Sequence, residues 1–255
     1  KSQPKLDKTM KDQKNNNSSE LIKKFSEISL TDIALVGGKN ASLGELFSQL
    51  TSKGINIPNG FATTSNAYRQ FLEENKILPD LTKIVAGLDR NNFSNLKETG
   101  AKARQLLLNG KLSEQLKASI LKEYTNLFEK QTIAEVAVRS SATAEDLPTA
   151  SFAGQHESFL NIRGEAQLLD AVQRCFASLF TDRAIKYRED HHFDHLQVAL
   201  SVGIQKMVRS DLASAGIAFT LEPESGFKDI IHITGSWGLG ENIVQGAVNA
   251  DEFYV

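Results

Sequence analysis

The spacing of apolar residues changes character about halfway along the chain. In the first half, apolar side chains recur three and four positions apart, which places them on one face of a helix. This spacing predicts helices over 43–50, from about 65 to 72, and across most of 78–128. Thr64 or Ser65 is suited to cap the second helix, because a hydroxyl at this position accepts a hydrogen bond from the first turn.

Beyond residue 131, short alternating apolar runs predict strands, and one long helix interrupts them. The strand over 198–205 is expected to be half-buried, because its apolar residues alternate with small or polar ones. The other expected strands cover 135–139, 159–162, 215–220 and 230–234, another begins at 252, and the helix covers 168–188. A helix-rich first half followed by a strand-rich second half indicates the α+β class.

Composition narrows the class of protein. The chain has 255 residues, 40% of them hydrophobic, and a net charge of −2. It can therefore build a sizeable core, and its charge gives no sign of a nucleic-acid partner. The single cysteine, Cys175, excludes an intrachain disulfide, and its apolar helical surroundings favour a buried structural thiol. No apolar run reaches the roughly 18 residues of a membrane span, and no signal peptide is visible, so a cytoplasmic protein is expected.

The two ends of the chain suggest a piece of a longer protein. Residue 1 is Lys rather than Met, and residues 252–255 read as a strand that is cut off. Residues 1–20 are polar and contain an Asn-Ser run, so they bury too little apolar surface to offset the entropy of ordering. We expect this segment to be a disordered tail.

One segment combines a strand end with a cation and several hydroxyls. Apolar residues 136–138 lead to Arg139, which is followed by Ser140, Ser141 and Thr143 and then by acidic residues. Arginine forks onto phosphate oxygens, and small hydroxyls add donors without bulk. We expect a loop here, which either grips a phosphate or is an ordinary turn with a solvated arginine. The segment by itself does not decide between the two.

Two glycine-containing segments are further candidates for ligand contact. Gly37 and Gly38 precede Lys39 at the expected start of a helix, where backbone N–H groups and the lysine could hold an anion. Asn40 follows the lysine, so this is not a Walker A loop, and a plain glycine turn explains it equally well. Around Gly154 and Ser158, backbone could approach a flat ligand, although a β-turn is the simpler interpretation.

Other possible sites are weaker. Gly238 and Gly240 begin a dinucleotide-like fingerprint, but Ile243 stands where its third glycine belongs. A cluster of histidines, His191, His192 and His195, lacks a metal-binding spacing and is expected to lie in a solvated loop. The sequence therefore predicts no metal ligand in this chain.

Together these segments resemble the nucleotide-binding domain of the family that contains phosphoenolpyruvate synthase, pyruvate phosphate dikinase and the rifamycin phosphotransferases. The matching stretches occur in family order and favour the synthase branch. They are 36–45, 58–64, 137–154, 176–180, 207–214 and 237–255.

The resemblance implies an ATP-grasp-like domain over 21–255, incomplete at its C-terminal end, in which two subdomains clamp ATP. Lys39 and Arg139 match residues that contact the nucleotide phosphates. Gly154 and Ser158 match positions that line the nucleotide, and Gln205 matches the hinge strand where adenine is read. Ser140, Ser141 and Thr143 fall in the family's mobile phosphate loop and receive only a supporting role.

The resemblance also implies what this chain does not supply. The magnesium-binding acid and a partner glutamine would lie beyond Val255, and domains carrying the phosphohistidine and the pyruvate site would lie further on. The complete enzyme would convert ATP, pyruvate and water to phosphoenolpyruvate, AMP and phosphate; this chain alone is expected to be inactive. A dikinase, a rifamycin-type phosphotransferase and a non-catalytic nucleotide-binding fragment remain alternatives, and homo-oligomerisation stays open. No membrane or nucleic-acid partner is expected.

Overall fold

The computed structural model describes residues 20–128, 135–143 and 157–255. The chain divides into two compact units, residues 1–207 and 208–255, and each is described by itself.

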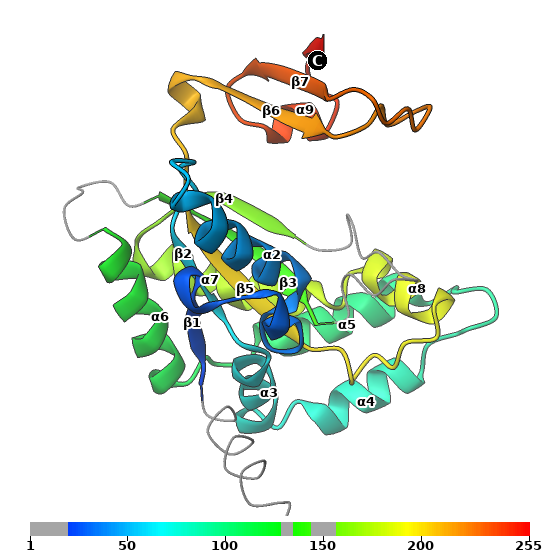
Figure 1. Ribbon diagram of the computed structural model, residues 1–255. Coiled ribbons are helices and arrows are strands. Elements are labelled where there is room, and N and C mark those ends of the chain that lie inside the picture. The colour runs from blue at the N-terminus through cyan, green and yellow to red at the C-terminus, as the bar shows by residue number, and fades with distance from the viewer. Residues whose placement is uncertain (1–19, 129–134, 144–156) are drawn as a thin grey trace, which may run out of the picture. The chain divides into compact units, whose positions relative to one another are not determined.

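The first unit is built on an antiparallel five-stranded sheet (Figure 1). Its strand order is β1-β2-β5-β3-β4, so the central strand, β5, pairs with partners far away in the sequence. The strands are β1 (Ile22–Lys24), β2 (Gly60–Thr63), β5 (Leu200–Lys206), β3 (Glu135–Ala142) and β4 (Ser158–Arg163).

Helices cover both faces of this sheet. On one face, α2 (Ile33–Thr51) crosses β3 and β5 and closes a small core around Phe25. On the other face, a larger core contains Phe61, and Phe176 packs there against Tyr68. The remaining helices of this unit are α3 (Ser65–Glu74), α4 (Leu78–Ala86), α5 (Leu96–Leu108), α6 (Glu114–Leu127), α7 (Gly164–Ser178) and α8 (Asp182–Asp190), with short 3₁₀ turns at Phe25–Glu27 and Leu30–Asp32.

The structure confirms most of the predicted elements of the first unit. It adds β1 and β2, which were not predicted, and extends the helix expected over 43–50 back to Ile33. It also corrects three details. The stretch expected as one helix over 168–188 is two helices, because Thr181 leaves helical geometry and caps α8 by accepting a hydrogen bond from the Ala184 N–H. The half-buried strand is buried along nearly its whole length, since helices pack on both sides of β5. Leu46, expected to face inward, is 43% exposed.

The second unit is a three-stranded antiparallel sheet of order β6-β7-β8. No apolar side chain of residues 208–255 reaches the buried class. Its elements are a 3₁₀ turn at Ser210–Leu212, β6 (Ser214–Phe219), β7 (His232–Trp237), α9 (Glu241–Val244) and β8 (Asp251–Tyr254). All three strands confirm the prediction. Across the described parts of both units, every helix is too short or too polar to cross a membrane.

Candidate functional site

Three of the predicted site residues meet on neighbouring strands. Arg139 lies in β3, directly opposite Ser158 of β4 on one side and Gly203 of β5 on the other. Its guanidinium Nη1 donates a hydrogen bond of 3.1 Å to Oε1 of Gln205 on β5. The sheet pairing therefore brings together residues that are up to 66 positions apart in sequence.

Gln205 is held on both sides of its carboxamide. While Oε1 accepts from Arg139, Nε2 donates to the backbone oxygen of Pro58 at 3.0 Å, and the residue is 8% exposed. Arg139 is exposed, although partial loss of hydration lowers the pKa of its guanidinium from the usual value. An arginine remains charged at neutral pH, so the strands present an oriented cation.

Gly37 has a packing role in the segment that precedes Lys39. Its φ of +74° and ψ of 162° interrupt α2, and a side chain there would collide with the hydroxyl of Ser141. Helical geometry resumes after it, and the Asn40 N–H points to the Ser141 hydroxyl at 3.4 Å. Glycine is therefore required by the close approach of α2 to β3. The sequence had suggested either an anion site or a plain glycine turn here.

Asn40 then fixes this helix to the sheet, and Lys39 stays at the surface. The buried Asn40 carboxamide donates to the Val36 oxygen at 3.1 Å and to the Ser201 hydroxyl at 2.9 Å. Lys39, its neighbour, is exposed. The Asn40 side chain also packs against Gly203, which is the strand partner of Arg139. The helical turn that carries Lys39 and Asn40 therefore lies over the strands that carry Arg139.

The hydroxyls after Arg139 differ from the prediction. Ser140 and Ser141 belong to β3 rather than to a loop, and both are buried. Ser140 donates to the Glu157 oxygen, while Ser141 receives the Asn40 N–H, so both serve the packing of the sheet. Thr143 is bonded to Ala199. Gly154 and the acidic part of the expected loop lie outside the described residues.

The histidine cluster is only partly the solvated loop that was predicted. His191 and His192 are exposed, whereas His195 is 5% exposed and bonded to Arg188 and Glu189. Sequence spacing could not reveal this, because the partners come from the preceding helix. Within the described residues no group of three potential ligands could hold a metal ion.

Two further residues differ in burial. Cys175 is a fully buried thiol, and burial raises its pKa, as expected of a structural cysteine. Trp237, which lies beside Gly238, is 81% exposed, because the second unit has no buried apolar side chain to pack against it.

Comparison with known proteins identifies the family. The family described as "Pyruvate phosphate dikinase, AMP/ATP-binding domain" matches residues 33–255. Phosphoenolpyruvate synthase of Synechocystis sp. is 52% identical over 241 residues, and that of Escherichia coli is 48% identical over 241 residues. The matches cover 92% and 94% of this chain but only 30% of each relative, so the chain spans about three tenths of their length.

The likeness extends to Pseudomonas aeruginosa, whose phosphoenolpyruvate synthase is 50% identical over 236 residues, covering 92% of this chain and 30% of the relative. The family match includes both units, and it contains Lys39, Arg139, Ser158 and Gln205. The chain belongs to the family of the pyruvate phosphate dikinase AMP/ATP-binding domain.

Proposed function

We propose that this chain is the nucleotide-binding part of a phosphoenolpyruvate synthase, in which Lys39 and Arg139 hold the phosphates of ATP. The hydrogen-bonded pair of Arg139 and Gln205 carries the proposal, because it presents an exposed, oriented cation on a rigid sheet. Phosphoryl transfer depends mainly on positioning and charge neutralisation, which are what such a pair supplies. Ser158, opposite Arg139, and Gly154 would line the same nucleotide.

The hydrogen bond between Arg139 and Gln205 also refines their roles. The family resemblance assigns the arginine to the phosphates and the glutamine to the adenine, at opposite ends of the nucleotide. Side chains 3.1 Å apart act more simply on one part of the ligand. We therefore assign Gln205 to orienting the guanidinium, with Pro58 fixing the amide, so that Arg139 meets the phosphates with little loss of side-chain entropy.

Magnesium and the later chemistry are proposed for the longer protein. When bound, magnesium would neutralise phosphate charge. The described residues around Arg139 offer cations and hydroxyls but no cluster of carboxylates for the metal, so its ligands would come from elsewhere. An ATP-grasp-like clamp, a phosphohistidine domain and a pyruvate-binding domain complete the proposal. The overall reaction would convert ATP, pyruvate and water to AMP, phosphoenolpyruvate and phosphate in the cytoplasm.

Calorimetric titration with Mg-ATP tests the phosphate assignment. In a longer chain that spans the length of the relatives, Lys39→Ala and Arg139→Ala should each weaken binding about tenfold or more, the value of one lost charge-assisted contact. Lys53→Ala and Arg183→Ala remove exposed cations elsewhere and should bind as the parent does. The 255-residue chain should bind weakly or not at all. Wild-type affinity in both site variants would exclude the assignment.

The role of Gln205 and the reaction need separate measurements. Gln205→Ala should lower the rate of AMP formation. Gln205→Glu should lower it less, because its carboxylate can still accept the hydrogen bond from Arg139. Pyruvate-dependent AMP formation by the longer chain tests the synthase reaction itself. AMP formation only with added phosphate, or only with a rifamycin, would replace the synthase by a dikinase or by a drug phosphotransferase while leaving the nucleotide site intact.

A further inference from the structure

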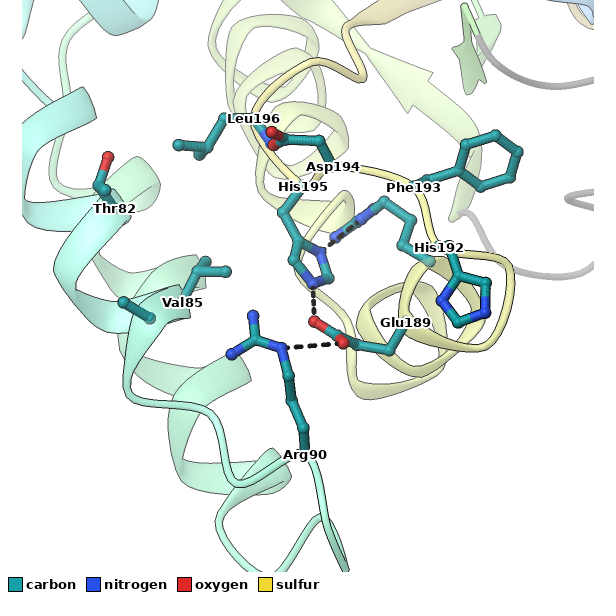
Figure 2. A pocket seen from close by; sticks show the side chains of 11 residues that line it. Thr82, Val85, Arg90, Glu189, His192, Phe193, Asp194, His195 and Leu196 are labelled. Atoms are coloured by element: carbon teal, nitrogen blue, oxygen red, sulfur yellow. Dashed lines mark hydrogen bonds and ion pairs between the residues drawn. The ribbon is translucent and has the colours of Figure 1, made fainter.

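A pocket of about 430 Å³ lies in the first unit (Figure 2), and neither Arg139 nor Lys39 lines it. Thr82 and Val85 of α4 form one wall, and the chain that leaves α8 forms the other, with His195 and Leu196 facing α4. Arg90 lies at one end, next to Glu189. The family resemblance assigns no role to these residues.

A fully buried guanidinium with an unused donor lines this pocket. Arg188 is 0% exposed; its Nε donates to Nδ1 of His195 at 2.9 Å, and its Nη2 donates to the Leu179 oxygen. Its Nη1 has no hydrogen-bond partner among the described residues. A buried donor without an acceptor costs free energy, so this group favours any ligand that brings an acceptor.

No carboxylate among the described residues forms a direct ion pair with Arg188. His195 receives the Arg188 hydrogen bond at Nδ1, so its own proton is on Nε2, which donates to Glu189 at 2.7 Å. Burial, with the nearby positive charge of Arg188, holds the pKa of His195 below its ordinary value and keeps the ring neutral. A neutral imidazole thus lies between the buried cation and the carboxylate of Glu189. Buried charges are normally paired, and an anionic ligand would supply the missing partner.

The remaining charges of the pocket leave room for an anion. Arg90 donates to Glu189 through Nε at 3.0 Å, and its two amino groups have no hydrogen-bond partner within the described chain. Glu189 is engaged by both Arg90 and His195, and Asp194 accepts the Leu196 N–H at 2.8 Å. Both carboxylates are therefore occupied, whereas each arginine retains donors.

Apolar side chains complete the lining and limit the ligand further. Val85, Ala86, Phe193 and Leu196 also line the pocket. A volume of about 430 Å³ lies within the range of small-molecule sites and exceeds what a bare ion fills. The pocket is shaped for a molecule with one charged end and an apolar body.

We propose that this pocket binds a small organic oxyanion, a carboxylate or a phosphate monoester. Its charged group is bound by Arg188 Nη1 and the Arg90 amino groups, and its apolar body lies against Val85 and Leu196. Because Nη1 is covered in the unliganded state, binding displaces a side chain of the wall. His192 is exposed on the turn that follows α8 and lines this wall.

Nuclear magnetic resonance titration of the 255-residue chain tests this proposal with benzoate, phenyl phosphate and benzyl alcohol. Benzoate or phenyl phosphate should shift the amide signals of Val85, Phe193 and Leu196, and benzyl alcohol should not. Tighter binding of benzoate would indicate a carboxylate ligand, and tighter binding of phenyl phosphate would indicate a phosphate monoester. Arg90→Gln should weaken binding about tenfold without unfolding the chain, because Arg90 is at the surface. Arg188→Lys keeps the positive charge but loses the guanidinium N–H donors, so it should weaken anion binding further.

Several results would overturn the proposal. If benzyl alcohol bound as tightly as the anions, the site would recognise only the apolar body. If Arg90→Gln bound the anions as tightly as the parent chain does, the positive charge of Arg90 would play no part in recognition. Shifts that centre on Lys39 and Arg139, and that vanish in Arg139→Ala, would mean the probes occupy the proposed phosphate site instead. No shift in the pocket amides with either anion would exclude the site altogether.

Discussion

At the scale of single residues, Gly37 shows how a glycine in a binding-like motif can be required by packing. Gly37→Ala should lower the free energy of unfolding by about 2–4 kcal/mol, because alanine is strained at a φ of +74° and its methyl group would meet Ser141. Urea denaturation measures the change.

A matched control separates strain from collision. Gly54 also has a positive φ, +81°, but nothing lies within 4 Å of the position its Cβ would take. Gly54→Ala should therefore cost only about 1 kcal/mol. Equal losses in the two variants would mean that α2 moves away from β3 at little cost, and the packing explanation would be wrong.

His195 predicts a dependence of stability on pH. The pKa of His195 is held below its ordinary value of 6.5, so the unfolded chain takes up a proton near pH 6.5 while the folded chain does not. The unfolded state then binds more protons, and stability falls as pH decreases from about 7 to 5, by at most about 1.4 kcal/mol per pH unit. The lowered pKa of Glu189 adds a loss only below its ordinary value of 4.5.

Two variants test this assignment by urea denaturation at pH 7 and pH 5. His195→Gln keeps an acceptor for Arg188 and a donor for Glu189 but cannot titrate, so its stability should change less with pH than that of the parent. His192→Gln, which removes an exposed histidine of the same loop, is the matched control. The same slope in His195→Gln as in the parent would exclude His195 as the origin.

Sequence reasoning located the candidate residues better than it explained them. Arg139 and Gln205 were both named, but their hydrogen bond depends on the pairing of β3 with β5, which no local pattern encodes. The sequence predicts a loop after Arg139, whereas sheet pairing keeps Ser140 and Ser141 in β3. The pocket around Arg188 was missed, because only the fold brings α4 to the turn after α8.

At the scale of elements, the attachment of α2 to the sheet depends on Asn40. Asn40→Ala should lower the free energy of unfolding by about 2–3 kcal/mol, because it leaves the buried Val36 oxygen and the Ser201 hydroxyl without a donor. Asn40→Asp should cost at least about 1 kcal/mol more, since a carboxylate would face those oxygens. Thermal or urea unfolding measures both.

The control for this prediction is an asparagine on another helix. Asn126 of α6 is exposed, and Asn126→Ala should change stability by less than about 0.5 kcal/mol. If Asn40→Asp were as stable as Asn40→Ala, the carboxamide would not be acting as a donor, and the link between α2 and β5 would have another origin.

Local patterns were sufficient for elements whose ends carry their own signals. Thr64 caps α3 as predicted, and the buried stripe of Leu116, Ile120 and Tyr124 matches α6. The break between α7 and α8 was missed because Leu179 and Phe180 continue the apolar pattern while packing in the core. Burial of β5 on both faces was missed because Ser201 and Gly203 look solvent-facing, although they lie beneath α2.

At the scale of the whole molecule, the α+β class followed from the sequence, but the division at residue 207 did not. Apolar residues are as frequent in the strands after 208 as before it, and only the structure shows that none of them is buried. Burial depends on which elements cover a strand. The first unit has long helices on both faces of its sheet, whereas the second unit has only the four-residue α-helix α9. Sequence periodicity identifies a strand's two faces but not what lies against them.

Because the second unit is exposed, we expect tryptophan fluorescence and far-ultraviolet circular dichroism to respond differently to urea. Trp237 is the single tryptophan and is 81% exposed, so its fluorescence should already be that of a hydrated indole in the native chain. Most helix lies in the first unit. Urea should therefore produce a cooperative loss of far-ultraviolet circular dichroism with little shift in tryptophan emission.

A peptide of residues 208–255 provides the decisive control. With no buried apolar side chain, it cannot offset the conformational entropy of ordering its strands, so it should show no cooperative transition in isolation. A chain ending at Met207 keeps both buried clusters and should unfold at nearly the same urea concentration as the 255-residue chain. A blue-shifted Trp237 emission that moves to the red together with the loss of helix would contradict this, because it would mean that Trp237 is covered in the native chain.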